Sequence, residues 1–526
     1  MTTSSKIRKH IFNLSPSKAT GLDGLSAKLL KVSADIIAPQ ISAICNTSIT
    51  TGVFPKEWKQ AKVIPLFKSG DSNIFTNYRP ISVLPVLSKI LERHVHDSLY
   101  AYLQKYHMLI DSQSGFRKYH SCETAIAKLT NDMLNAIDSG QIIGLLLIDL
   151  RKAFDLVDHE ILLEKLRIYG SSDMSSSWFQ SYLSHRTQCV TFNGVVSEPQ
   201  SLCIGVPQGS ILGPLFFILF MNDIVLEIED GTRFDMYADD SSQYYAGQSV
   251  DEVSNHLNEQ IKPVTNWISA NSMALNVEKT ETMIMHAKHR KLDISTYNLN
   301  INGKEIKVVN SHKLLGHHID NKFLWNIHVN KLCSKLQSRL FLLKKIKHLL
   351  PRSARITFFD GLVLPLIDFG CIMWTKTTKD NLKRIHKIMK QFARAILEIK
   401  CAKDLSTMDL FKTLDWLPID ARADYFTGVL VFKSLNGLAP DYMSKMFKLV
   451  SSVHNRKTRQ STRNLLFEPR AKTKYGQMSF SYIGARLWNN IPDHIRRLDK
   501  LDNFKVQYLK YCKDLAFKDS KFNLDL

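Results

Sequence analysis

The sequence predicts an α+β fold that becomes mostly helical beyond residue 320. Up to that point, strand-like runs and hairpin turns mix with helical stretches, but without the strict β-α-β order of a parallel sheet. After it, apolar residues recur mainly at steps of three and four, as in amphipathic helices. The chain has 526 residues, 44% of them hydrophobic, which is enough for a large buried core and more than one domain.

The first 170 residues carry clear local signals. Residues 25–44 have the apolar spacing of a helix, 62–71 (KVIPLFKSGD) predict a strand and a turn, and 80–103 predict a loop that leads into a helix. The run QIIGLLLIDL at 141–150 is continuously apolar, which favours a buried strand. Residues 158–170 predict an amphipathic helix that ends near Gly170.

Hairpin signals dominate the next 150 or so residues. Residues 186–210 read as two strands around a turn at Asn193–Gly194, and 233–247 (RFDMYADDSSQYYAG) as a hairpin with two aspartates at its tip. Residues 249–276 predict a helix and 280–287 a strand. Residues 299–320 predict one hairpin, with its turn at Asn302–Gly303.

A strongly basic helix is predicted at 380–400 (DNLKRIHKIMKQFARAILEIK), with Asp380 as its N-cap. Its apolar residues form one stripe and most of its Lys and Arg lie on the other faces. Two interpretations stay open: the basic faces track nucleic-acid phosphates, or they form an ordinary solvated surface.

The charge is high and unevenly placed. The net charge is +21, which suggests a polyanionic partner, most often nucleic acid and less often a membrane surface. Residues 1–320 carry 31 Lys and Arg against 32 Asp and Glu, whereas 321–526 carry 39 against 17. We therefore expect a catalytic first part and a second part that grips a polyanion.

Three further features favour an intracellular protein without a membrane anchor. The eight cysteines are scattered singly, with no C-x-x-C pair, as is typical of reduced thiols. The N-terminus lacks the apolar core of a signal peptide. The longest apolar run, ILGPLFFILFM at 211–221, is too short to span a bilayer and predicts a buried element.

Three carboxylates raise the question of chemistry. Asp149 ends the buried run at 141–150, and Asp239 and Asp240 occupy the tip of the predicted hairpin. A carboxylate at the end of an apolar strand is costly unless it is paired or bound to a cation. Convergence of the three on divalent metal would satisfy them, and Mg²⁺ prefers such oxygens. The alternative for Asp239–Asp240 alone is an ordinary solvated turn.

Several ordered motifs decide between these readings. The chain resembles the reverse transcriptases of non-LTR retrotransposons, of the LINE type and Jockey-like, over about residues 10–320. The resemblance rests on seven segments: 62–93 (KVIPLFKSGDSNIFTNYRPISVLPVLSKILER), 113–125 (QSGFRKYHSCETA), 145–159 (LLLIDLRKAFDLVDH), 205–224 (GVPQGSILGPLFFILFMNDI), 236–242 (MYADDSS), 276–281 (NVEKTE) and 313–320 (KLLGHHID). The Tyr-x-Asp-Asp motif alone is weak, but so many motifs in order are specific. The basic tail, with GARLWNNIPDHIR at 484–496, is also similar to the tails of such proteins.

The resemblance implies a metal centre. Asp149 and Asp239 would be the principal metal ligands and Asp240 the third carboxylate, and the backbone carbonyl of Leu150 would also face a metal. Two Mg²⁺ ions, with Mn²⁺ as the alternative, would serve in-line phosphoryl transfer.

It also implies a nucleotide pocket. Phe154 stands where the family has an aromatic gate that excludes a 2′-OH, although simple core packing is the alternative. Gln208 would hydrogen-bond near the incoming nucleotide, and Gly209 would let backbone approach the template-primer. The remaining assignments are Lys62 and Arg79 as triphosphate contacts, with surface solvation as their alternative, Lys279 as the proton donor to the leaving pyrophosphate, and Leu315 and Gly316 as the primer grip.

The implied fold is a right-hand polymerase. Residues 1–60 would be an N-terminal extension, 61–320 the fingers and palm with an antiparallel sheet, 321–400 a thumb-like helical region, and 401–526 a basic C-terminal region of unknown function. The motifs begin close to Met1 and leave no room for the endonuclease that full-length elements carry. We therefore expect a polymerase-plus-tail product.

The implied function is RNA-directed DNA polymerisation, with an RNA template, a DNA primer and dNTPs as partners. We expect the protein in the nucleus and cytoplasm as a ribonucleoprotein. The alternative is a decayed or co-opted relic that binds nucleic acid without polymerising. An RNA-directed RNA polymerase is a weaker rival, because Phe154 at the gate position argues against it.

Overall fold

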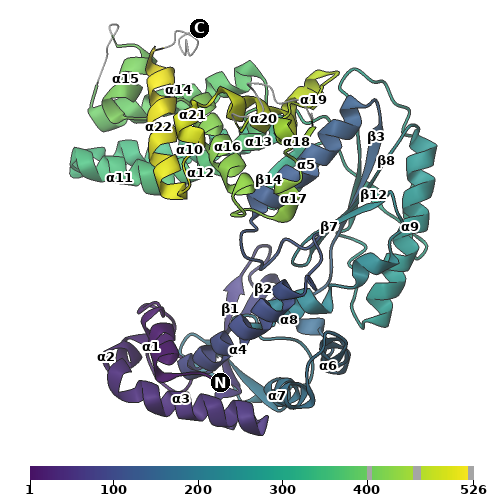
Figure 1. Cartoon of the computed structure of the whole chain (residues 1–526), viewed down its shortest axis with the longest axis vertical. Helices are drawn as coiled ribbons and strands as arrows, with labels where there is room; N and C mark the ends of the chain where they lie inside the picture. The colour runs from purple at the N-terminus through teal and green to yellow at the C-terminus, as the bar shows by residue number, and fades with distance from the viewer. Residues whose placement is uncertain (400–404, 454–463, 519–526) are drawn as a thin grey trace.

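In the computed structural model, residues 1–399, 405–453 and 464–518 are described. Viewed as in Figure 1, the chain has the outline of a reversed letter C that opens to the left. An N-terminal lobe forms one end, the C-terminal helices form the other, and a central sheet joins them. The mixture of helices and mostly antiparallel sheets is the α+β class that the sequence predicts.

The central sheet has the strand order β12-β9-β3-β8-β7. All its pairs are antiparallel except β12 with β9. Its strands are β3 (Ile142–Ile148), β7 (Arg233–Tyr237), β8 (Asp240–Gly247), β9 (Glu281–Met285) and β12 (Lys307–Val308). Every residue of β3 is buried, as the continuous apolar run predicts.

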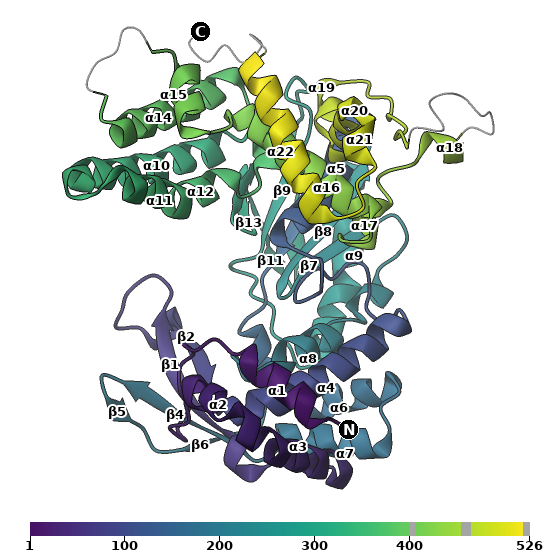
Figure 2. The same ribbon diagram turned by 60° about the vertical axis from the view of Figure 1, so that its left-hand side comes forward.

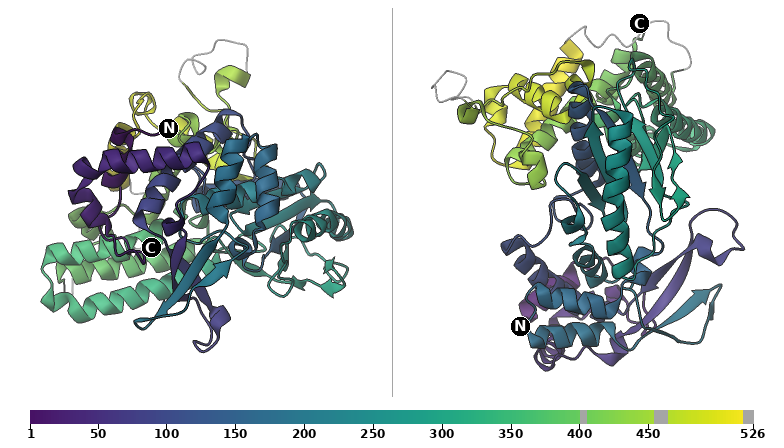
Figure 3. Two further views of the ribbon diagram at one scale, coloured as in Figure 1. Left: turned by 90° about the horizontal axis from the view of Figure 1, so that it is seen from below. Right: turned by 90° about the vertical axis from the view of Figure 1, so that its right-hand side faces the viewer.

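The two faces of β3 belong to different cores. Ile143, Leu145 and Leu147 pack with α5 (Cys122–Asp138), whereas Ile142, Leu146 and Ile148 join the core that contains α9 (Val250–Ala270). Because successive side chains of a strand point to opposite faces, this division places α5 and α9 on opposite sides of the sheet. The right-hand view of Figure 3 shows α9 lying along one face.

The N-terminal lobe combines a second sheet with helices. The strand order is β2-β1-β4-β5, with β6 also paired to β4. Its strands are β1 (Gln60–Phe67), β2 (Tyr78–Val83), β4 (Arg186–Phe192), β5 (Val195–Val196) and β6 (Gln200–Leu202). Its helices are α1 (Ser4–Phe12), α2 (Ala27–Val32), α3 (Ala34–Thr51), α4 (Val86–Lys105), α6 (His159–Ile168), α7 (Asp173–Leu183) and α8 (Leu212–Phe220).

Two local predictions in the first 320 residues were wrong. Residues 78–83 form strand β2 rather than a loop: Pro80 is accommodated because β2 is an edge strand that pairs only with β1. Residues 299–320 form two hairpins rather than one. The first joins β10 (Asn300–Ile301) to β11 (Lys304–Glu305), and the second joins β13 (Ser311–Leu314) to β14 (His317–Asp320) through a turn at Leu315–Gly316.

The C-terminal helices fill the other end of the molecule (Figure 2). They are α10 (Asn326–Ile346), α11 (Arg352–Leu362), α12 (Leu364–Asp368), α13 (Cys371–Trp374), α14 (Lys379–Leu397), α15 (Thr407–Leu414), α16 (Ile419–Leu435), α17 (Asp441–Ser444), α18 (Val450–Val453), α19 (Lys474–Met478), α20 (Phe480–Asn490), α21 (Asp493–Arg496) and α22 (Leu501–Lys518). Helix α14 is the basic helix predicted at 380–400. Its N-cap is Thr378 rather than Asp380, because the Thr378 side chain accepts from the Asn381 backbone N–H. The last residue of the predicted range, 400, lies outside the described residues.

These helices share a core with the central sheet. The buried residues of α10 to α22 form one apolar cluster with α5 and with β3 and β9. Helix α5 is the main contact: Asp138 at its end accepts hydrogen bonds from the backbone N–H groups of Lys472 (3.0 Å) and Thr473 (2.6 Å), and the Asn131 side chain accepts one from Ser481 N–H (2.9 Å). The C-terminal part of the chain is therefore built onto the sheet.

The predicted buried element at 211–221 is α8, and every residue from Leu212 to Met221 except Pro214 is buried. Among the described residues, no helix is both long enough and apolar enough to cross a bilayer.

Candidate active site

The adjacent aspartates lie at the tip of the β7–β8 hairpin. Tyr237 pairs with Asp240, so Ala238 and Asp239 form a two-residue turn. Ala238 has a φ of 57°, in the left-handed region that residues other than glycine rarely adopt. A conformation of this kind persists only where its surroundings hold it.

The third carboxylate comes from the neighbouring strand. Strand β3 is antiparallel to β8, and the last pair in their register is Ile148 with Ser241. One step further, the same register sets Asp149 opposite Asp240. The three carboxylates that the sequence singles out are thus gathered at one end of two adjacent strands.

The pKa of Asp240 responds both to burial and to the neighbouring carboxylates. This residue borders solvent, yet the surrounding protein still removes part of the hydration of its carboxyl group. The pKa of Asp240 is raised by that burial and then by the negative charges of Asp239 and Asp149, while His312 and Lys68 act in the opposite direction. The site is therefore short of positive charge.

Asp149 is held by a residue that sequence reasoning missed. The Asn276 side-chain amide donates to Asp149 Oδ2 (2.8 Å), and Asn276 N–H donates to the Asp149 carbonyl (2.8 Å). The next residue, Leu150, forms a bridge with Leu275, and no hydrogen bond among the described residues engages the Leu150 carbonyl. Asn276 opens the NVEKTE motif, so its position in that motif was the available signal.

The donor chemistry fits a divalent cation. Carboxylate and carbonyl oxygens are the ligands that Mg²⁺ and Mn²⁺ prefer. Burial raises the pKa of Asp240 most, and the charges of Asp239 and Asp149, which such a cation would neutralise, raise it further. Within the described residues, however, no group of three His, Cys, Asp or Glu side chains is close enough to form a finished metal site. Uncompensated carboxylates repel one another, and Asp149 is instead turned to Asn276.

The turn itself is held by Gln113, a second residue that was missed. Gln113 Oε1 accepts from Ala238 N–H (2.9 Å), and Gln113 Nε2 donates to the Ala238 carbonyl (3.3 Å). The backbone on either side of Gln113 pairs with β7, since Ser114 N–H donates to the Met236 carbonyl and Met236 N–H to the Ser112 carbonyl (2.8 Å each). Gln113 is the first residue of the QSGFRKYHSCETA segment.

The segment at 205–210 packs against the N-terminal lobe. Gln208 Nε2 donates to Asp155 Oδ1 (2.9 Å), and the Gln208 carbonyl accepts from Ser82 N–H (2.8 Å). Gly209 has a φ of 136°, and a Cβ there would lie 2.1 Å from the Ser82 carbonyl oxygen. Gly209 is thus required for the close approach of this segment to β2.

A buried carboxylate anchors the helix that follows this segment. Glu92, on α4, is completely buried and accepts from the N–H groups of Ile211 (2.7 Å) and Leu212 (3.3 Å) at the start of α8. It also accepts from the Ser88 hydroxyl (2.6 Å). A negative charge at a helix N-terminus satisfies its free N–H donors, so Glu92 fixes where α8 begins.

Phe154 lies in a short 3-10 turn, Ala153–Leu156, behind the carboxylates. Its ring stacks on Phe217 of α8, with ring centroids 4.2 Å apart, and meets the edge of Phe116 at 5.9 Å. The residue is half-buried, so one part of it packs in the core while another part faces outward.

Lys62 and Arg79 stand on the β1–β2 ladder. Lys62 pairs with Val83 and Arg79 with Leu66, which places both basic side chains on the same face of the ladder. Arg79 is exposed and Lys62 is half-buried. Lys68, which follows β1, is the basic residue of this region that lowers the pKa of Asp240. Sequence reasoning had not selected it.

The remaining candidates flank the carboxylates on other sides. Lys279 is exposed in the turn that begins at Asn276, and its N–H donates to the Asn276 carbonyl (3.1 Å). Leu315 and Gly316 form the β13–β14 turn with φ values of 45° and 88°. Leu315 and Asp240 line the same small cavity, so this turn lies beside the carboxylates.

Comparison with known proteins identifies the core of the chain. The family model described as reverse transcriptase (RNA-dependent DNA polymerase) matches residues 68–319, a stretch that contains Asp149, Asp239 and Asp240. Residues 68–319 therefore resemble a reverse transcriptase domain. The matched stretch includes the central sheet, β2 and the β13–β14 hairpin.

Relatives of the chain come from non-LTR retrotransposons. In Drosophila melanogaster, the chain is 27% identical to the protein named "Probable RNA-directed DNA polymerase from transposon BS" and 25% identical to "RNA-directed DNA polymerase from mobile element jockey". Each match covers 75% of this chain and 44% of the relative. A third relative, from transposon X-element, is 25% identical over 74% of this chain and 43% of its own length. The chain spans less than half the length of these curated relatives.

We predict that Gly209→Ala lowers the stability of the fold much more than Gly194→Ala does. Both glycines have positive φ, but a Cβ at Gly194 would meet nothing within 4 Å, whereas a Cβ at Gly209 would collide with the Ser82 carbonyl. Gly194→Ala should cost only the backbone strain of about 1 kcal/mol, and Gly209→Ala should cost several times as much. Thermal unfolding followed by circular dichroism measures both. Equal shifts in Tm would contradict the close approach at Gly209.

Proposed function

We propose that this chain is an RNA-directed DNA polymerase of a non-LTR retrotransposon, which extends a DNA primer on an RNA template by two-metal phosphoryl transfer. The observation that carries the proposal is the gathering of Asp149 and Asp240 on adjacent strands beside Asp239, within a stretch that matches the reverse transcriptase family. In-line phosphoryl transfer needs such a carboxylate cluster to bring metal to the attacking and leaving oxygens.

We further propose the right-hand arrangement for this fold. The central sheet with α5 and α9 would be the palm, and β1, β2 and the helices of the N-terminal lobe would be the fingers. Residues 321–400 would be the thumb, preceded by an extension at 1–60 and followed by a basic region at 401–526. The C-shaped outline in Figure 1, with α10 to α12 and the β1–β2 ladder at opposite ends, supports this assignment.

Within this proposal, Asp149, Asp239 and Asp240 hold the metal, with the Leu150 carbonyl as a further oxygen. Mg²⁺ is the expected ion and Mn²⁺ the alternative. When bound, the ions would supply the charge that stabilises the attacking primer hydroxyl and the leaving pyrophosphate. Asn276 orients Asp149, and Gln113 fixes the turn that carries Asp239.

The incoming dNTP would lie between the carboxylates and the β1–β2 ladder. Lys62, Lys68 and Arg79 would neutralise its triphosphate, because phosphate recognition needs Lys and Arg. Phe154 would exclude a 2′-OH, and Gln208, held by Asp155, would face the nucleotide. Lys279 would donate a proton to pyrophosphate.

The template-primer would follow a basic strip formed by Lys313 on the β13–β14 hairpin and by Lys331 and Lys335 on α10. Leu315 and Gly316 are the proposed primer grip beside Asp240. Lys313, Lys331 and Lys335 surround His318: its pKa is lowered to about 4 by burial and then by Lys331, Lys313, Lys335 and His312. Such concentrated positive charge on the hairpin and α10 suits phosphates of a nucleic-acid strand.

The central test is Asp239→Asn. We expect primer extension on an RNA template with Mg²⁺ to fall by a factor of about a hundred or more, because the lost carboxylate holds metal. RNA affinity should stay near that of the native chain. Asp230→Asn, at an exposed position just before β7, is the matched control and should extend normally. Near-normal extension by Asp239→Asn would contradict the proposal. A native chain that binds RNA but never extends a primer would instead indicate a decayed or co-opted retrotransposon protein.

Substitution of the gate residue tests nucleotide choice. Phe154→Val should raise the ratio of rNTP to dNTP incorporation by about ten-fold or more, because a smaller side chain leaves space for the 2′-OH. The control is Phe216→Val, on α8, the helix against which Phe154 packs. It removes a fully buried ring and should leave the ratio of rNTP to dNTP incorporation unchanged even if it lowers stability. An unchanged ratio in Phe154→Val would assign Phe154 to core packing. A native preference for rNTPs would favour the RNA polymerase rival.

The basic strip is tested by salt dependence. If Lys331 and Lys335 each contact a phosphate, Lys331→Gln/Lys335→Gln should lower the log–log slope of affinity against salt by about 1.4 to 1.8. Lys262→Gln/Lys291→Gln, at two exposed positions on α9 and after β9, should leave the slope unchanged. Binding of a labelled template-primer at several salt concentrations gives both slopes. Equal slopes for the two double variants would remove the strip from the nucleic-acid path.

A further inference from the structure

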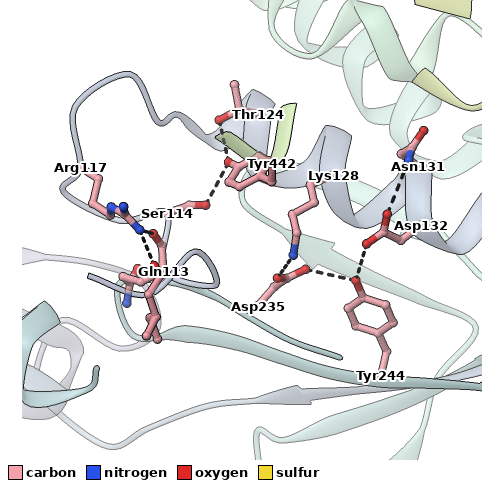
Figure 4. A network of polar contacts seen from close by, with 11 residues as sticks. Gln113, Ser114, Arg117, Thr124, Lys128, Asn131, Asp132, Asp235, Tyr244 and Tyr442 are labelled. Atoms are coloured by element: carbon pink, nitrogen blue, oxygen red, sulfur yellow. Dashed lines mark hydrogen bonds and ion pairs between the residues drawn. The ribbon is translucent and has the colours of Figure 1, made fainter. Parts of the chain in front are cut away.

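Tyr442 joins the C-terminal helices to the segment that holds the catalytic turn. It lies on α17 and is only 7% exposed. Its hydroxyl donates to Thr124 Oγ1 (3.1 Å) on α5 and lies 3.1 Å from Ser114 Oγ. Because the single Tyr442 proton goes to Thr124, Ser114 is the donor in the second bond. Figure 4 shows the Tyr442 hydroxyl between these two partners.

Several side chains pack around the Tyr442 ring. The His120 ring meets its edge with centroids 5.7 Å apart, and Lys128 Nζ lies 5.7 Å from its ring centroid. Lys128 itself pairs with Asp235 of β7 (Figure 4). At the rim, Lys445 of the C-terminal region pairs with Asp111 (2.9 Å). A ring enclosed in this way has one position available.

From Ser114 the contacts continue to the catalytic turn in two steps. Ser114 N–H pairs with β7, and its neighbour Gln113 grips both the N–H and the carbonyl of Ala238. The approach is tight: a Cβ at Gly115 would lie 2.3 Å from the Ala238 nitrogen. Movement of Ser114 must therefore move the turn residue that precedes Asp239.

The turn that these contacts reach has an unusual backbone. Ala238 has a φ of 57°, a strained conformation that the surrounding contacts must hold in place.

We propose that Tyr442 is a positioning residue for polymerisation: through Ser114 and Gln113 it fixes the Ala238–Asp239 turn, so that the C-terminal region completes the metal site from a distance. The inference rests on the proposed polymerase function for its kinetic consequence, but the effect on the turn does not depend on catalysis. It gives the region beyond residue 401 a role other than contact with nucleic acid.

The test is Tyr442→Phe in the full chain, which removes the hydroxyl and keeps the ring. We expect the rate of single-nucleotide addition to fall about five-fold, the effect of one buried neutral hydrogen bond. The Mg²⁺ concentration for half-maximal rate should rise by a similar factor. RNA affinity should stay near the native value, and Tm should fall by no more than about 2–3 °C, because only one hydrogen-bonding group is lost and α17 remains packed.

Tyr475→Phe is the matched control. Its hydroxyl also links the C-terminal region to residues 68–319 and their flank, accepting from Lys288 N–H (2.7 Å) and donating to the Lys322 carbonyl (3.4 Å), but it does not contact the segment at 112–115. It should leave the Mg²⁺ dependence unchanged. An equal shift in both variants would mean that Tyr442 acts only through general stability and would overturn the proposal.

A double-mutant cycle and a direct metal measurement complete the experiment. Ser114→Ala breaks the same bond from the other side, so the double variant with Tyr442→Phe should be no slower than the worse single variant. Additive losses would overturn the proposed route. Mn²⁺ binding, followed by electron paramagnetic resonance without nucleotide, should weaken about five-fold in Tyr442→Phe. If the native chain never polymerises but this weakening is seen, the proposed function fails and the positioning role stands; unchanged Mn²⁺ affinity would overturn the positioning role.

Discussion

Electrostatic repulsion among Asp149, Asp239 and Asp240 is the constraint to which the surrounding structure responds. Asp149 and Asp240 lie at the ends of two adjacent strands, and the pKa of Asp240 is raised by burial and then by the charges of Asp239 and Asp149. Chains that gather like charges must hold them by contacts made elsewhere. Here Asn276 turns Asp149, and Gln113 holds both backbone groups of Ala238 beside Asp239. The backbone of the site is held in place by polar contacts, so a bound cation would have to reorient side chains such as Asp149 but would not have to order the backbone.

The contacts that hold the carboxylates come from parts of the chain that are far apart in sequence. Glu92 on α4 fixes the start of α8, and Gly209 allows the preceding segment to lie against β2. Tyr442 is 328 positions from Ser114. Glu92 and Gly209 act on the segment at 209–212, whereas Tyr442 and Gln113 act on the segment that holds the turn. Because Tyr442 contacts the residue next to Gln113, the effects of these two on activity should be coupled rather than additive.

The sequence could predict the elements whose signal is local. The run at 141–150 became β3 because seven consecutive apolar residues can be buried on both faces, and the alternation around Ala238 gave a hairpin. The prediction from sequence failed at β2, where Pro80 suggested a loop. Proline is tolerated there because β2 is an edge strand, and the position of a strand in its sheet is not a local signal. It also missed the turn at Leu315–Gly316, since leucine at positive φ is a choice that only tertiary packing explains. For the site, motifs indicated the carboxylates. Asn276 and Gln113 lie within motifs that do not reveal their partners, and no motif includes Tyr442.

Residues 321–526 contribute to the packing of the core as well as carrying most of the positive charge. Residues 321–526 hold 39 Lys and Arg against 17 Asp and Glu, which first suggests a separable grip on nucleic acid. Yet the described part of this region shares a core with β3, β9 and α5, and Asp138 of α5 accepts from the Thr473 N–H just before α19. A fragment that ended at residue 320 would expose that core and release Tyr442 from Ser114 at once. Loss of binding by such a fragment would therefore not identify its cause. The charge can be separated from the packing only at exposed basic positions such as those of α10, where a side chain can lose its charge without leaving a cavity.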